Sequence, residues 1–134
     1  MEGERQMDAI AQRSREMLPP LVSLDRRIAD ALAARSLPEL TQAYASLTQR
    51  VAESEAHLEN GNDACGCDAA LGNLAILVGF AINKLDGEGR YQDWMAGESL
   101  ELLENYRSLA AACAEDSGRA TFKSRIEPAL IETL

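Results

Sequence analysis

Two cysteines flank a single glycine in the segment Cys65-Gly66-Cys67, directly ahead of the longest apolar stretch of the chain. Cysteine thiolates bind soft metal ions and are the reacting groups of disulfide chemistry, so this segment is the first candidate for a chemical site. On a regular helix, residues two positions apart point about 200° away from each other. Cys65 and Cys67 could therefore act on one centre only if the chain is unwound there, which Gly66 permits.

The only histidine, His57, lies in the preceding helical segment, and a short turn would place it roughly opposite residues 65 to 68. His57, Cys65 and Cys67 could then form a three-ligand nitrogen and sulfur site suited to Zn(II) or Cu(I). Structural zinc sites, however, normally have four ligands with two to four residues between paired cysteines, and Cys113 is the only remaining thiol. The sequence favours ordinary buried thiols, because Cys67 is in register with the apolar positions that follow it, and it leaves open a metal site or a redox pair.

Signatures of known catalytic sites are not found in the sequence. His57 has no second Glu-x-x-His partner of the kind that a di-iron carboxylate site needs, and no G-x-S-x-G motif is present. The segment "GEG" at 87 to 89 lacks the further glycines and the lysine of a phosphate-binding loop. Asn73 and Asn83, inside an apolar segment, leave a small enzyme pocket as a third and weaker hypothesis. We therefore do not expect an enzyme.

The composition predicts an all-α protein. Alanine and leucine dominate, aromatic residues make up 4% of the chain, and valine and isoleucine are sparse, which suits helices better than sheets. A chain of 134 residues has the usual size of one domain and is long enough to bury its own core. We expect a single domain spanning residues 1–134.

Helical periodicity, interrupted by recognisable stop signals, predicts a mainly antiparallel bundle of five to six helices. The expected helices span residues 4–18, 20–35, 37–59, 64–86 and 98–116, with a short amphipathic piece at 91–95 and a last short helix beginning near Ser124. Pro19 and Pro20 should break or kink the chain. Ser36, followed three residues later by Glu39, is a capping box that marks a helix start.

The segment 64–86 is apolar around most of its circumference, which predicts a helix covered on nearly all sides. Gly72 and Gly79 lie seven residues apart on one side of it, and each costs a helix about 1 kcal/mol relative to alanine. Close approach of another backbone would offset this cost. That backbone could belong to the same chain or to a second copy, so a homodimer is one of two options. Tyr91 and Trp94, between glycines, are the candidate exposed anchors of an interface.

The formal net charge is −9, and residues 37 to 134 hold sixteen acidic and seven basic residues. A surface of that sign repels phosphate, so we expect no direct binding of nucleic acid. The first residues mix charges of both signs, unlike a signal peptide, and the apolar run 69–82 is shorter than the ~20 residues that span a bilayer. We expect a cytoplasmic location, no membrane contact and a protein partner that is itself basic.

These observations favour a protein-binding function over a metal- or thiol-binding function. The expected function is a small acidic protein-binding module, such as an adaptor, a chaperone-like factor or an inhibitor, which acts by docking of a helix face and as a homodimer. The alternative is a metal- or thiol-binding protein built on Cys65, Cys67 and His57, with Zn or Cu as the cofactor.

Overall fold

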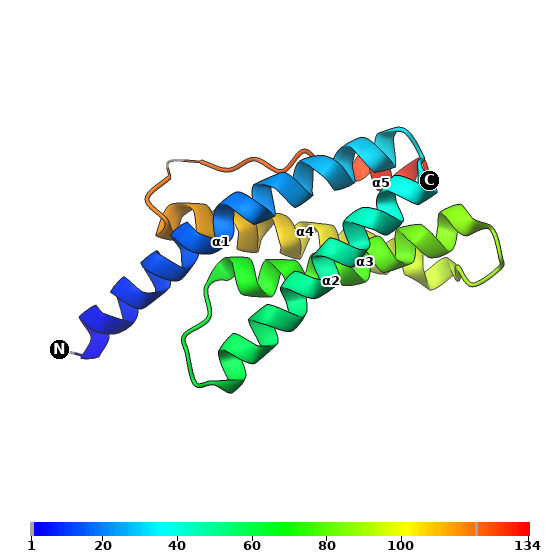
Figure 1. The fold of residues 1–134 in the computed structure, drawn as a ribbon. Coiled ribbons are helices and arrows are strands. Elements are labelled where there is room, and N and C mark those ends of the chain that lie inside the picture. Colours follow the sequence, from blue (N-terminus) through cyan, green and yellow to red (C-terminus); the bar gives the residue numbers. More distant parts are fainter. Residues whose placement is uncertain (1, 120) are drawn as a thin grey trace.

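The structure is a computed structural model of the 134-residue chain, and it describes residues 2–119 and 121–134. The helices in this part of the chain are α1 (Glu2–Ala33), α2 (Leu37–Glu59), α3 (Gly66–Asp86), α4 (Asp93–Asp116) and α5 (Pro128–Glu132). The four long helices reverse direction in turn, and the short α5 lies beside the end of α1 (Figure 1). The predicted all-α bundle is confirmed.

The core lies between the four long helices and consists mainly of leucine and alanine. α3 packs against α4 and α2, while α1 lies across α2, α3 and α4. Burial of apolar surface is the main force that holds such a bundle together. The largest fully buried side chains are Leu18, Leu21, Ile28, Leu40, Leu47, Leu71, Leu74, Leu77, Val78, Leu103, Tyr106 and Ile126.

α1 continues as one helix through Pro19 and Pro20, so the predicted separation into helices at 4–18 and 20–35 is wrong, while the kink predicted there as the alternative stays a prediction. Proline has no N–H group, and each proline inside a helix costs about 3 kcal/mol or more. The neighbouring side chains of Met17, Leu18 and Leu21 are almost completely buried. Burial of each such side chain contributes roughly 1.5–3 kcal/mol, so the packing of these three side chains is comparable with the cost of the two prolines and offsets it.

The predicted boundaries of α2 are confirmed at both ends. The side chain of Ser36 accepts a hydrogen bond from the backbone N of Glu39 at 3.4 Å, as a capping residue does. The chain leaves the helix through Gly61, whose φ of 79° lies in the left-handed region that glycine adopts without strain. Local capping signals therefore set these two ends.

The start of α4 differs from the prediction. The helix begins at Asp93 and passes through Gly97, so the piece at 91–95 and the helix at 98–116 are largely one element and Trp94 lies in its first turn. At the other end of the chain, Ser124 does not begin a helix, because α5 begins at Pro128 after the N-cap residue Glu127. The hydroxyl of Ser124 has a different role.

A buried carboxylate fixes the segment between α4 and α5 to α1. Asp25 of α1 is 1% exposed and accepts hydrogen bonds from the hydroxyls of Tyr106 at 2.5 Å and Ser124 at 2.6 Å. The backbone N of Arg125 donates to the same carboxylate at 2.8 Å. Burial, together with the negative charge of Asp25, raises the pKa of the Tyr106 phenol far above its ordinary value. These hydrogen bonds explain why the non-helical segment between α4 and α5 runs alongside α1 (Figure 1).

Within the described chain α3 is not covered on nearly all sides, so the prediction that the bundle surrounds this helix is wrong, while the alternative, that a second copy covers its spare face, stays a prediction. Ile76 is 51% exposed and Phe80 is half-buried, because the neighbouring helices cover α3 only in part. Among the described helices, α3 is also long and apolar enough to cross a membrane, with a mean hydropathy of 1.4 over its most apolar window. Since 44% of that window is buried within the bundle, its composition equally suits a central helix of a folded domain.

Candidate functional site

The three cysteines meet where the start of α3 lies against the end of α4. Their sulfur atoms all lie within 4.8 Å of one another, and all three side chains are buried. Cys67 and Cys113 form a disulfide with a Cα–Cα distance of 5.4 Å. Cys65 keeps a free thiol, and its Sγ lies 4.0 Å from the Sγ of Cys113. Burial raises the pKa of this thiol, which keeps it protonated at neutral pH.

Gly66 lets the two helices approach closely enough for this arrangement. A Cβ atom at this position would lie 2.5 Å from the carbonyl O of Leu109 and 3.1 Å from the backbone N of Cys113. The first of these distances is shorter than any real Cβ contact, and backbone atoms cannot rotate away. The glycine between the two cysteines therefore serves the contact with α4, and that contact brings Cys113 to the start of α3.

Cys65 and Cys67 converge because the backbone changes conformation between them. Cys65 is the N-cap residue of α3, with extended angles φ −113° and ψ 175°, whereas Cys67 lies in the first turn of the helix. This is the departure from regular helix that two cysteines at this spacing need in order to share a centre. Both sulfur atoms consequently face the end of α4.

His57 does not belong to this group of sulfur atoms. Its Nε2 atom lies 2.8 Å from the carbonyl O of Asp63, in the loop that joins α2 to α3, and the ring is half-buried. The residue that joins Cys65 and Cys67 is instead Cys113. Little in the sequence points to this, because Cys113 falls on the apolar stripe of its helix as an ordinary core residue does.

An ion pair lies next to the cysteines and was not predicted. Asp68 is 7% exposed and accepts two hydrogen bonds from the guanidinium of Arg13, at 2.8 and 3.3 Å. The Ser54 hydroxyl donates to it at 2.6 Å and the backbone N of Cys65 at 2.9 Å. Burial by itself would raise the pKa of Asp68, but these donors outweigh it and hold the pKa at about 2. The carboxylate thereby joins α1, α2 and the start of α3.

A second candidate site is the uncovered side of α3, next to the first turn of α4. Ile76 is 51% exposed and Trp94 is 59% exposed. The ring of Phe80 packs edge-on against that of Trp94, with their centroids 5.6 Å apart. We call this surface the α3 face, and its residues are Gly72, Ile76, Gly79, Phe80 and Trp94.

The two glycines of the α3 face are not in contact with another backbone of the described chain. A Cβ atom at Gly72 would meet nothing within 4 Å, and at Gly79 it would meet only the side chain of Tyr44, at 3.7 Å. The close backbone approach within the chain occurs at Gly66 instead. The predicted anchor Tyr91 lies apart from the α3 face, where the ammonium of Lys84 is 4.9 Å from the centroid of its ring.

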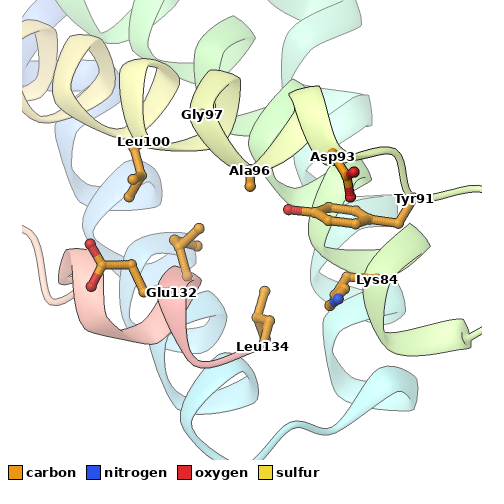
Figure 2. Close-up of a pocket in the computed structure, with 9 residues that line it drawn as sticks. Lys84, Tyr91, Asp93, Ala96, Gly97, Leu100, Glu132 and Leu134 are labelled. Carbon is orange, nitrogen blue, oxygen red and sulfur yellow. The ribbon is translucent and has the colours of Figure 1, made fainter.

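A surface pocket of about 380 Å³ lies between the end of α3, the start of α4 and α5. Tyr91 and Lys84 stand on one side of it, and Glu132 and Leu134 stand on the opposite side (Figure 2). Asp93 belongs to its upper rim in this view. The charged side chains in this lining are those of Lys84, Asp93 and Glu132.

Comparison of the chain with models of known protein families, with curated protein sequences and with solved structures gives no match. The candidate sites are therefore defined by the geometry of this chain alone. They are an uncovered apolar helix face and a buried group of three sulfur atoms, at different positions along α3.

Proposed function

We propose that this chain is a protein-binding module that acts by docking of a helix face, and that the α3 face binds a second copy of the chain. The observation that carries the proposal is the exposure of Ile76, at 51%, beside a glycine that has open space above it. Covering apolar surface contributes roughly 25 cal/mol per Å², so an exposed isoleucine and tryptophan on one face favour association.

The spacing along α3 fits a two-fold pairing of this helix with itself. Gly72 precedes Ile76 by four residues, and Gly79 follows it by three. In an antiparallel pair centred close to Ile76, Gly72 of each copy faces Gly79 of the other, and the two isoleucines meet at the axis. Two-fold interfaces use the same patch on both subunits, which this spacing allows. Gly72 leaves open space above α3, and the side chain of Tyr44, which lies beside Gly79, would form part of the contact.

The distribution of charge also supports a second copy of the chain as the partner of the α3 face. With a net charge of −9, two copies repel each other at long range, and contact through an uncharged surface keeps this repulsion smallest. The charged residues of α3 are Asp68, which is buried, and Lys84 and Asp86 near its end. The α3 face carries none of them. The acidic surface elsewhere stays free in such a dimer and would attract a basic protein over long range.

Trp94 is the expected anchor at the border of this interface. Tryptophan is enriched among the residues that contribute most to protein binding. The edge-on contact with Phe80 holds the Trp94 ring in place before binding. Less side-chain entropy is then lost when a partner covers it.

The test is the oligomeric state in solution, measured by sedimentation velocity over a series of concentrations. The wild-type chain should form a dimer, and Ile76→Asp should shift it to monomer. The matched control is Leu58→Asp, because Leu58 on α2 is 46% exposed but lies outside the α3 face, and this variant should dimerise like the wild type. A wild-type chain that is monomeric at every concentration, or an Ile76→Asp variant that dimerises unchanged, contradicts the proposal.

A further inference from the structure

The group of three sulfur atoms supports a second inference, which is independent of the α3 face. We propose that Cys65, Cys67 and Cys113 form a redox-gated site for one Cu(I) ion. The site is closed while the Cys67–Cys113 disulfide is intact, since a single thiol then remains. It opens when a two-electron reductant, such as a dithiol, converts the disulfide into two thiols.

The positions of the sulfur atoms fit trigonal coordination. A metal ion about 2.3 Å from each of three sulfur atoms, in their plane, requires the sulfur atoms to be about 4.0 Å apart. The Sγ atoms of Cys65 and Cys113 are already 4.0 Å apart, and the Sγ of Cys67 belongs to the same group within 4.8 Å. Once the disulfide is open, the third sulfur reaches its place by rotation about side-chain bonds.

The ligand set selects Cu(I) over other common metal ions. Thiolates are soft ligands, which favour Cu(I), zinc and iron–sulfur clusters over hard ions such as magnesium or calcium. Zinc in structural sites is normally four-coordinate, whereas the group found among the described residues offers three ligands. The nearby carboxylate of Asp68 is already engaged by Arg13, Ser54 and the backbone of Cys65. Three buried sulfur atoms suit the three-coordinate geometry that Cu(I) accepts.

Opening of the site is a two-electron reduction of the disulfide and needs no oxidant. A dithiol transfers two electrons and two protons to the Cys67–Cys113 bond, which breaks to give two thiols while the dithiol becomes a cyclic disulfide. Cu(I) then binds three sulfur atoms and releases their protons to solvent. The resulting negative charge lies at the start of α3, where the free backbone N–H groups of the helix favour anions.

The test is a titration of the full chain with Cu(I), in competition with a coloured Cu(I) chelator and without oxygen. One sample keeps its disulfide, and the other is reduced with a phosphine that is removed before the titration, because a phosphine is itself a soft ligand for Cu(I). The reduced chain should bind one equivalent with thiolate-to-copper absorption in the ultraviolet, and the oxidised chain should bind at least about 100-fold more weakly. Equal binding in both states overturns the gating, and no binding by the reduced chain overturns the site.

Two variants test which side chains hold the copper ion. Cys65→Ser leaves the disulfide and the fold in place but removes one ligand, so it should lower the affinity of the reduced chain on the order of 100-fold. His57→Ala, the matched control, should bind like the wild type because His57 lies outside the sulfur group. A Cys65→Ser chain that binds Cu(I) unchanged, or a His57→Ala chain that loses it, overturns the assignment of ligands.

Discussion

Replacing Gly66 with alanine should destabilise this chain, although the same change in most helices stabilises them. Gly66 is the first residue of α3, and the added methyl group would lie 2.5 Å from the carbonyl O of Leu109 in α4. This carbonyl O and the backbone N of Cys113, 3.1 Å from the same position, belong to α4 backbone that is fixed by helical hydrogen bonds. The clash can be relieved only if the ends of the two helices move apart, which disturbs the packing around Cys67 and Cys113.

The magnitude follows from two opposing effects. Forcing an extra methyl group into a well-packed site typically costs about 1–3 kcal/mol. The gain from replacing glycine with alanine in a helix is about 1 kcal/mol in the interior and less at the first residue. We therefore expect Gly66→Ala to lower the free energy of unfolding by about 1–2 kcal/mol. With a urea slope of about 2 kcal/mol per M, in the middle of the usual range, the midpoint should fall by roughly 0.5–1 M.

The assay is urea unfolding of the oxidised chain, followed by circular dichroism, with Gly97→Ala as the matched control. Gly97 lies inside α4 and is exposed, and a Cβ there meets nothing within 4 Å. That variant should gain up to about 1 kcal/mol, so the two alanine variants should differ by about 1–3 kcal/mol. A Gly66→Ala chain that is as stable as the wild type would refute the argument that α4 requires this glycine.

Three further predictions concern stability. Asp68→Asn should lower the free energy of unfolding by about 2 kcal/mol at neutral pH, because the folded chain holds the pKa of Asp68 at about 2 instead of its ordinary 3.8. This stabilisation is complete above pH ~4 and is lost as the pH falls towards ~2. Urea unfolding at a series of pH values should therefore show that the difference in free energy of unfolding between variant and wild type vanishes at low pH. A difference that does not depend on pH contradicts this prediction. Asp25→Ala leaves the buried hydroxyls of Tyr106 and Ser124, and the backbone N of Arg125, without their acceptor, and should cost about 3 kcal/mol or more. Amide exchange at Arg125 should become faster, and unchanged exchange there argues against the network. Pro19→Ala restores a helix hydrogen bond at an exposed position and should raise the thermal midpoint, by a free energy of about 1–3 kcal/mol; a lower midpoint would mean that the proline fits this helix.

The features that could be predicted from the sequence are those set by neighbouring residues. The start of α2 follows from Ser36 and Glu39, and its end follows from Gly61, so local hydrogen bonds and a left-handed turn were enough. The all-α class follows in the same way from composition and periodicity. The break expected at Pro19 and Pro20 failed because the same local reasoning ignores the burial of the adjacent side chains in the bundle.

The parts of the candidate site that could not be predicted depend on residues far apart in the chain. Cys67 and Cys113 are 46 residues apart, and either of them alone resembles a core residue on an apolar stripe. Their pairing depends on how closely α3 and α4 approach, which the structure attributes to Gly66. The ion pair between Arg13 and Asp68 joins helices in the same way, and no spacing in the sequence marks it.

The composition of α3 is explained by two different demands along one helix. Its start must lie against the backbone of α4, which requires Gly66 and places the sulfur atoms of Cys65 and Cys67 beside Cys113. Ile76 lies nine residues beyond Cys67, about 14 Å along the axis at 1.5 Å per residue, and faces outward. A core helix covered on one side needs apolar residues on that side only. Packing within the described chain does not use the additional apolar residues on the other side of α3, and the proposed contact with a second copy would account for them.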